Sequence, residues 1–145
     1  MRRDQKDMTM RALSLCLAAL ILGSATPALA HPSLQERGEA ELTGQLAGRV
    51  PGKPVDCIAL NRIDGQTIID GTAIVYRGMG DTIWLNRPRG SERLREDDVP
   101  VQYVYGSELC KLDQVKLLDR GTRMERGFVG LGQFVPYTKA DKTTH

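Results

Sequence analysis

The chain has 145 residues, of which 41% are hydrophobic and 26% are charged, a composition typical of one soluble globular domain. Its formal net charge is +2, but residues 31–145 alone hold 16 basic and 16 acidic side chains, so this part of the chain is formally neutral. A neutral domain lacks the excess of cations that neutralises phosphates, which argues against a nucleic-acid partner.

Residues 1–30 have the three parts of a secretory signal peptide. The start is basic, an apolar run covers residues 12–22, and residues 28–30 read Ala-Leu-Ala, a small-x-small cleavage site. The apolar run is too short for a membrane span of about 20 residues, and Pro27 breaks any helix before the cleavage site. We therefore expect cleavage after residue 30, no membrane span in the cleaved chain, and a periplasmic or secreted product.

Residues 31–48 are predicted to form a short N-terminal helix or a loosely packed tail. Ser33 and Glu36 have the spacing of a capping box, which marks the start of a helix. Few apolar side chains follow, and Gly48 ends the segment. The segment therefore offers little surface for a partner helix.

Residues 49–137 are predicted to form one small β domain, because their hydrophobic period is two rather than 3.6. Asp-Gly turns are expected at residues 64–65 and 70–71. The predicted strands cover residues 55–60, 67–69, 72–76, 82–86, 99–105 and 112–118, with a Gly-rich aromatic segment over 128–137 closing the sheet. Residues 87–98 carry mixed charges and are predicted to be an exposed loop, and the tail over residues 138–145 to be disordered.

The predicted fold class is therefore mainly β, a small antiparallel barrel or sandwich with a short N-terminal helix. Two cysteines, Cys57 and Cys110, remain after cleavage, an even number in an oxidising compartment, which favours one disulfide. A metal site would need further His or Cys ligands, and a nucleophilic thiol would need a nearby base. The disulfide places the two Cα atoms about 4.4 to 6.8 Å apart.

Histidine placement excludes several chemistries. The cleaved chain has two histidines, His31 at its first residue and His145 at its last, so no internal imidazole serves a Ser-His-Asp, Cys-His or zinc arrangement. The α-amine and imidazole of His31 would chelate copper only with a second, internal histidine. We therefore expect no cofactor and no metal, and we assign no catalytic residue.

Carboxylates and aromatic residues supply the remaining candidates. Two acidic groups roughly 5 to 10 Å apart can hydrolyse a glycoside, although sequence spacing alone does not show such a pair. The candidate acids are Asp56, Asp64, Asp70, Asp113 and Asp119. The candidate ligand or partner surface consists of Trp84, Tyr103, Tyr105, Phe134 and Tyr137. Core packing competes for these side chains, because the chain has only seven aromatic residues, all between positions 76 and 137.

The leading functional hypothesis is a non-catalytic periplasmic module that binds a protein or contributes to the cell envelope. It rests on the predicted leader, the lack of internal histidines and the neutral charge of residues 31–145. The alternative is a small carboxylate-dependent periplasmic hydrolase.

Five segments, taken in order, resemble a family of small secreted proteins of Gram-negative bacteria whose function has not been assigned. The segments cover residues 52–58, 69–72, 84–87, 109–115 and 130–137, and the resemblance extends over residues 48–137. Members often carry a further cysteine pair, whereas this chain has Val129 before its Gly-Leu-Gly sequence and Arg and Ser near the charged loop. The resemblance implies secretion and a bond between Cys57 and Cys110.

Overall fold

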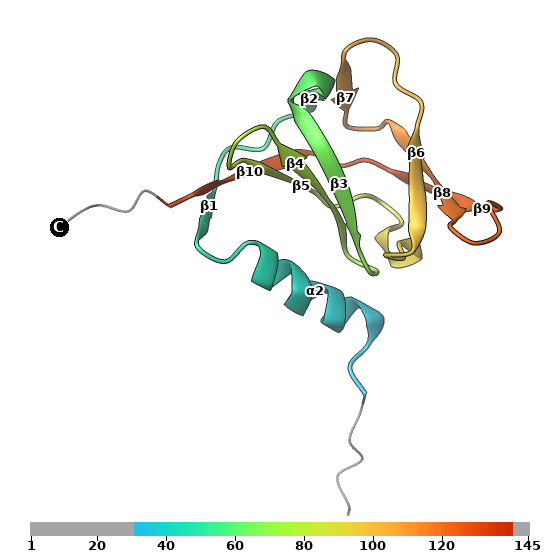
Figure 1. Cartoon of the computed structure of the whole chain (residues 1–145). Coiled ribbons are helices and arrows are strands. Elements are labelled where there is room, and N and C mark those ends of the chain that lie inside the picture. Colours follow the sequence, from blue (N-terminus) through green and yellow to red (C-terminus); the bar gives the residue numbers. More distant parts are fainter. Residues whose placement is uncertain (1–30, 141–145) are drawn as a thin grey trace, which may run out of the picture. The chain divides into compact units, whose positions relative to one another are not determined.

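The computed structural model describes residues 31–140 (Figure 1). The predicted signal peptide and most of the predicted C-terminal tail lie outside the described residues. Residues 32–140 belong to one compact unit, which is described here by itself.

The described part of the chain contains one α-helix, ten strands and two short 3-10 helices. The helix is α2 (Leu34–Gln45), and the 3-10 helices are η1 (Leu60–Arg62) and η2 (Ser91–Arg93). The strands are β1 (Arg49–Pro51), β2 (Cys57–Ala59), β3 (Ile63–Ile69), β4 (Ala73–Gly78), β5 (Ile83–Asn86), β6 (Asp98–Gln102), β7 (Glu108–Cys110), β8 (Gln114–Asp119), β9 (Glu125–Gly130) and β10 (Phe134–Lys139). The predicted mainly β fold with a short N-terminal helix is therefore confirmed.

The strands form three antiparallel sheets. The largest has the order β1-β10-β5-β4-β3, the second pairs β2 with β7, and the third has the order β6-β8-β9. Within the described residues, β3 pairs only with β4, and β6 pairs only with β8. Of the two predicted alternatives, a closed barrel is not formed, because β3 and β6 each keep one unpaired edge.

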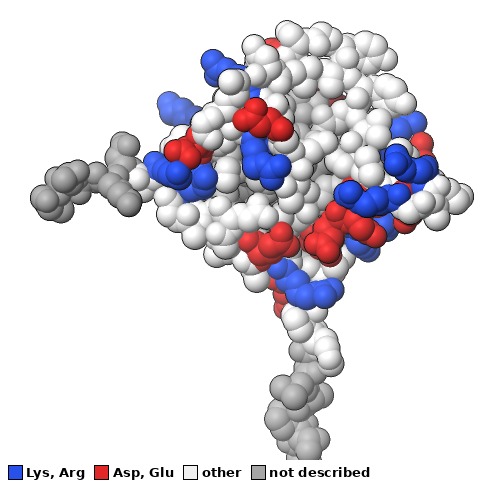
Figure 2. Space-filling model, viewed as in Figure 1, with Lys and Arg blue, Asp and Glu red and all other residues white. Residues whose placement is uncertain are grey.

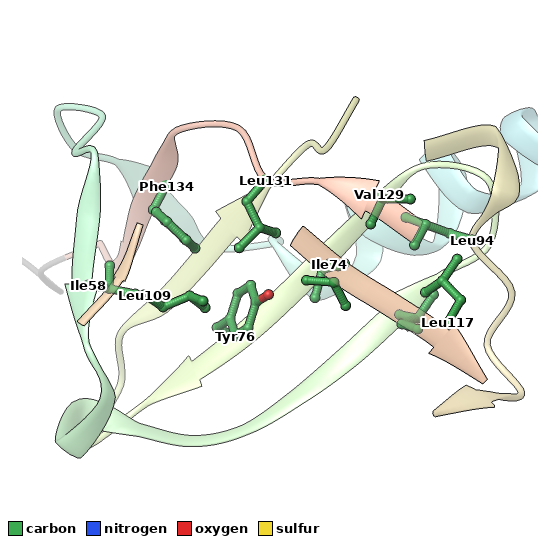
Figure 3. Packing of buried hydrophobic residues seen from close by; sticks show 11 residues of the cluster. Ile58, Ile74, Tyr76, Leu94, Leu109, Leu117, Val129, Leu131 and Phe134 are labelled. Carbon is green, nitrogen blue, oxygen red and sulfur yellow. The ribbon is translucent and has the colours of Figure 1, made fainter. Parts of the chain in front are cut away.

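The five-stranded sheet has a hydrophobic cluster on each face, and successive side chains of a strand contribute to opposite clusters. On β4, Ala73 and Val75 pack in a cluster with Leu42 of α2, whereas Ile74 and Tyr76 pack in the cluster facing the two smaller sheets. Figure 3 shows this second cluster, in which the Tyr76 and Phe134 rings meet edge to face with centroids 5.7 Å apart. Strand β4 thus contributes side chains to both hydrophobic clusters, which explains why almost all of its residues are buried.

Helix α2 docks closely onto the sheet and is no loose tail. The capping box is present: the Ser33 hydroxyl accepts from the Glu36 amide at 3.2 Å, and the Ser33 amide donates to the Glu36 carboxylate at 2.6 Å. A Cβ added to Gly38 would lie 2.1 Å from the Asp70 carbonyl oxygen. Because only glycine permits this approach, Gly38 fixes where the helix rests on the turn between β3 and β4.

The bond between Cys57 and Cys110 is present, with its Cα atoms 4.0 Å apart, closer than we predicted. The two residues face each other across β2 and β7. Their neighbours carry the ladder hydrogen bond, from the Lys111 amide to the Asp56 carbonyl at 2.6 Å, while the Cys110 amide donates to the Asp113 carboxylate at 2.7 Å. The cysteines thus occupy a pair without mutual backbone hydrogen bonds, and the strands approach most closely at such pairs.

Several local predictions were wrong. The Asp-Gly sequence at 64–65 lies inside β3, at a shift in register between Ile63 and Gly65, and η1 is the element that connects β2 to β3. Residues 87–98 are not simply an exposed loop, because they contain η2 and the fully buried Leu94. The segment over 128–137 divides between two sheets, and β10 continues to Lys139, beyond the predicted end of the domain at residue 137.

Candidate functional site

The carboxylates considered for catalysis are mostly occupied by local contacts. Asp56 forms an ion pair with Lys111 at 2.6 Å and accepts from Gln133 at 2.8 Å, contacts that lower the pKa of its carboxyl group. Asp119 accepts from the Thr122 amide at 2.8 Å in a turn, which lowers its pKa as well. A lowered pKa keeps both groups ionised and unsuited to donate a proton.

The other three candidate acids do not meet in a cleft. Asp70 accepts from the Glu96 amide at 2.6 Å, and Asp113 accepts from the Cys110 amide. Asp64 is exposed beside the irregularity in β3. Asp70 and Asp113 thus serve as hydrogen-bond acceptors for backbone amides of neighbouring segments.

The five predicted surface aromatics do not form one surface. Phe134 was wrongly predicted to belong to this surface. Its side chain is fully buried, and its ring packs against Tyr76. Tyr137 packs on the α2 side of the sheet, whereas half-buried Trp84 packs against the other cluster. Tyr103 and Tyr105 follow β6 and are 63% and 96% exposed.

A hollow lined by acidic side chains lies between the unpaired edges of β3 and β6, and we call it the seam groove. It has a volume of about 530 Å³ and is lined by residues 66–68, residues 96–100, Glu41 and Arg120. β3 and β6 lie beside each other in Figure 1, and Figure 2 shows acidic and basic atoms side by side over the lower part of this face. The groove thus combines an open edge of each sheet with a charged wall.

Hydrogen bonds close the seam at both ends of the groove. At one end, the Gln102 side-chain amide donates to Gln66 at 2.8 Å and to the Tyr76 hydroxyl at 2.9 Å. At the other, the Gly71 amide donates to the Leu94 carbonyl at 3.1 Å, beside the contact of Asp70 with the Glu96 amide. These two contacts are here called the clasps. Gln66 on β3 and Asp70 directly after β3 are four residues apart, a length of about 13 Å in a strand.

Asp98 is the most unusual residue of the groove and was missed by the sequence analysis. Its side chain is fully buried; Oδ1 accepts from Arg126 at 2.9 Å, and Oδ2 has no hydrogen-bond partner. Burial raises the pKa of its carboxyl group, and the neighbouring Arg126 charge opposes this increase. A buried polar atom without a partner is uncommon and points to a ligand, water or stored strain.

The orientation of Asp98 depends on pairing. In β6, Asp98 pairs with Asp119 and Gln102 with Val115, so even-numbered residues face inward. The alternating apolar positions 101, 103 and 105 of the strand predicted over residues 99–105 begin on the outward side. In the sequence, the one feature that could have pointed to Asp98 is that it directly precedes the strand predicted over residues 99–105.

One group of possible metal ligands lies close together within residues 31–140: Cys57, Glu108 and Cys110. Both sulfur atoms belong to the disulfide and so are not available as thiolate ligands. No helix in this part of the chain is long and apolar enough to cross a membrane.

Comparisons of the chain with protein-family models, curated proteins and solved structures found no match. The described residues define a mainly β domain with three sheets, one disulfide and an acid-lined groove at an open seam. The groove and its acidic side chains are therefore the candidate functional site of the described residues.

Proposed function

We propose that the protein is an exported, non-catalytic binding module that holds a small ligand in the seam groove. The observation that carries the proposal is the seam itself, where two strand edges face each other unpaired between two clasps. Concave sites with a few converging polar groups on an otherwise rigid scaffold are typical of ligand binding. A groove of about 530 Å³ is of the size that such sites have.

Export is the second part of the proposal. It is supported by the leader predicted at residues 1–30 and by the disulfide, because such bonds persist in oxidising compartments. The resemblance to a secreted family agrees with it. Mass measurement of the exported protein should give a chain beginning at His31, and recovery of only the intact precursor from the cytoplasm would contradict export.

A carboxylate-dependent hydrolase is the second candidate, favoured by one observation. Asp98 has the raised pKa that a general acid needs, and Glu96 and Asp97 line the same groove. However, Asp98 is paired through Oδ1 with Arg126, whose charge favours the ionised form of the carboxyl group over the acid form that a general acid needs. We therefore favour binding without turnover.

The test is a set of nuclear magnetic resonance titrations of residues 31–145 with pools of small molecules. We expect one pool to shift the backbone amides of residues 66–68 and 96–99 while the spectrum of the added compound stays chemically unchanged. New product signals that vanish in Asp98→Asn would favour the hydrolase instead. Shifts centred on Trp84 or on the exposed tyrosines, or no binding from any pool, would contradict a ligand site in the groove.

A matched pair of variants locates the ligand independently. Thr67→Trp fills the groove from β3 and should abolish binding, because Thr67 lines it. Gln114→Trp adds the same bulk at an exposed position of β8 and should leave binding unchanged. Thermal unfolding of both variants shows whether the domain is folded, and equal binding by both would refute the assignment.

A further inference from the structure

The seam groove carries an excess of negative charge. Glu41, Glu96 and Asp97 line it with exposed carboxylates, and Arg120 is the one cation among the described lining residues. Asp98 does not change this balance, because Arg126 already pairs with it. A recess lined by one sign of charge concentrates ligands of the opposite sign.

The buried Asp98 oxygen is an independent sign of a missing donor. Asp98 is 1% exposed and lines the groove, and its Oδ2 accepts no hydrogen bond. An acceptor left unsatisfied in a protein interior costs about 1 to 3 kcal/mol. A ligand N–H group that enters between β3 and β6 would relieve this cost.

We propose that the ligand of the seam groove is a small aliphatic diamine or polyamine, bound through its ammonium groups. This inference rests on the binding function proposed above for the same groove. The ammonium groups contact the carboxylates of Glu41, Glu96 and Asp97, and one of them reaches the free oxygen of Asp98. The alkyl chain between them lies against Ile68, Val99 and Pro100, which also line the groove.

A divalent metal ion fits the groove less well. Ca²⁺ needs six to eight oxygen ligands and Mg²⁺ six, all within about 2.6 Å of the ion. Within residues 31–140, no three carboxylates of the groove come as close together as the cysteine-containing group does. Charges spread along the groove match cationic groups that are separated by a chain.

An inserted peptide strand also fits less well. Pro100 has no amide to donate from β6, and the amide of Asp98 is already bound to the Arg95 carbonyl at 3.0 Å. The two clasps also limit the open seam to about 13 Å, the length of about four strand residues. A longer strand would have to break a clasp.

The first experiment is calorimetry at low ionic strength on residues 31–145 with the disulfide intact. We expect saturable binding of spermidine and 1,4-diaminobutane, binding of 1-butylamine at least tenfold weaker, and none of 1,4-butanediol. Equal binding of the diol would overturn the proposal, as would binding of Ca²⁺ without binding of the amines. Tighter binding of trilysine than of spermidine would favour a peptide ligand and also overturn it.

Charge variants provide the second experiment. Glu96→Gln and Asp97→Asn should each weaken spermidine binding about fivefold or more, whereas Arg120→Gln should strengthen it by removing the opposing cation. Glu125→Gln is the matched control, because Glu125 pairs with Lys116 at 3.1 Å on the outer side of the third sheet. Equal weakening by Glu96→Gln and Glu125→Gln would mean non-specific attraction and would refute a site in the groove.

Amide shifts separate failure of this inference from failure of the proposed function. A neutral or anionic ligand that shifts residues 66–68 and 96–99, with no amine bound, would refute the ligand class alone. Amines that shift only residues around Glu125 would refute both the ligand class and the binding role of the groove.

Discussion

The fold joins its sheets in two opposite ways. Where β2 meets β7, two three-residue strands are held by the bond between Cys57 and Cys110. Where β3 approaches β6, longer strands stay unpaired and are held at the clasps by hydrogen bonds. The difference teaches that the covalent bond lies where two short strands offer few backbone contacts, whereas the seam between the longer strands stays open and is held only at its ends.

The largest effect should come from breaking the covalent junction. Cys57→Ala should lower the free energy of unfolding by about 4 kcal/mol, because the bond spans 53 positions and its loss frees a long loop in the unfolded chain. Urea denaturation measures this change. The double variant with Cys110→Ala should be little worse, since both substitutions remove the same bond; additive losses would show that each cysteine contributes separately.

The next largest effect should come from the core beneath the seam. Leu94→Ala should cost about 3 kcal/mol, because Leu94 is fully buried in the larger cluster and its removal leaves a cavity. Leu112→Ala is the control, at a leucine that is 63% exposed, and should change stability by less than about 0.5 kcal/mol. Equal costs in thermal unfolding would mean that the segment before β6 is not anchored by Leu94.

A smaller effect is expected at the clasp made by Gln102. Gln102→Leu should cost about 1 kcal/mol, because it removes the hydrogen bonds to Gln66 and to the Tyr76 hydroxyl. Hydrogen exchange should accelerate in the β3 amides near residue 66 and remain unchanged in β2. Unchanged exchange throughout β3 would show that this clasp does not hold the seam.

The smallest effect, and the one that contrasts the two junctions most directly, is on pH dependence. Asp56, beside the disulfide, has a pKa lowered by its contact with Lys111, so its contribution to stability is present at neutral pH and lost as the pH falls through its folded-state pKa. Asp98, in the seam, has a pKa raised by burial, so its ionised form disfavours the fold and acidification relieves this cost.

Urea midpoints between pH 7 and pH 3 test these opposite signs. Asp56→Asn should reduce the loss of stability on acidification, and Asp98→Asn should increase it, each relative to the unsubstituted domain. Changes of the same sign in both variants would contradict the assigned directions.

Local patterns were sufficient to predict much of the fold. Alternation placed strands at residues 72–76 and 82–86, the spacing of Ser33 and Glu36 predicted a helix start, and counting cysteines predicted the disulfide. Leu94 could not be predicted as core, because it is a single apolar residue between Arg93 and Arg95 and forms no period.

The candidate site was harder to predict than the strands. Asp98 faces inward only because β6 pairs with β8 in a particular register, and a register between distant segments leaves no local signal. The seam groove likewise lies between β3 and β6, which belong to different sheets and do not pair with each other, and the sequence does not show which strands remain unpaired. Of the aromatic residues that attracted a functional interpretation, Phe134 is used for core packing instead, whereas Tyr103 and Tyr105 are exposed.

The pairing of β1 with β10 has a consequence for the order of folding. Arg49 lies opposite Lys139, and helix α2 shares its cluster with Val135 and Tyr137 of the same final strand. Strand β1 therefore cannot pair until β10 is present, whereas helix α2 already contacts the earlier turn between β3 and β4 through Gly38. Such distant contacts slow folding, since loop closure must precede any gain from the contact. A chain truncated before Phe134 would therefore keep the surface that binds α2 on β3 and β4 but would lack the strand that pairs with β1.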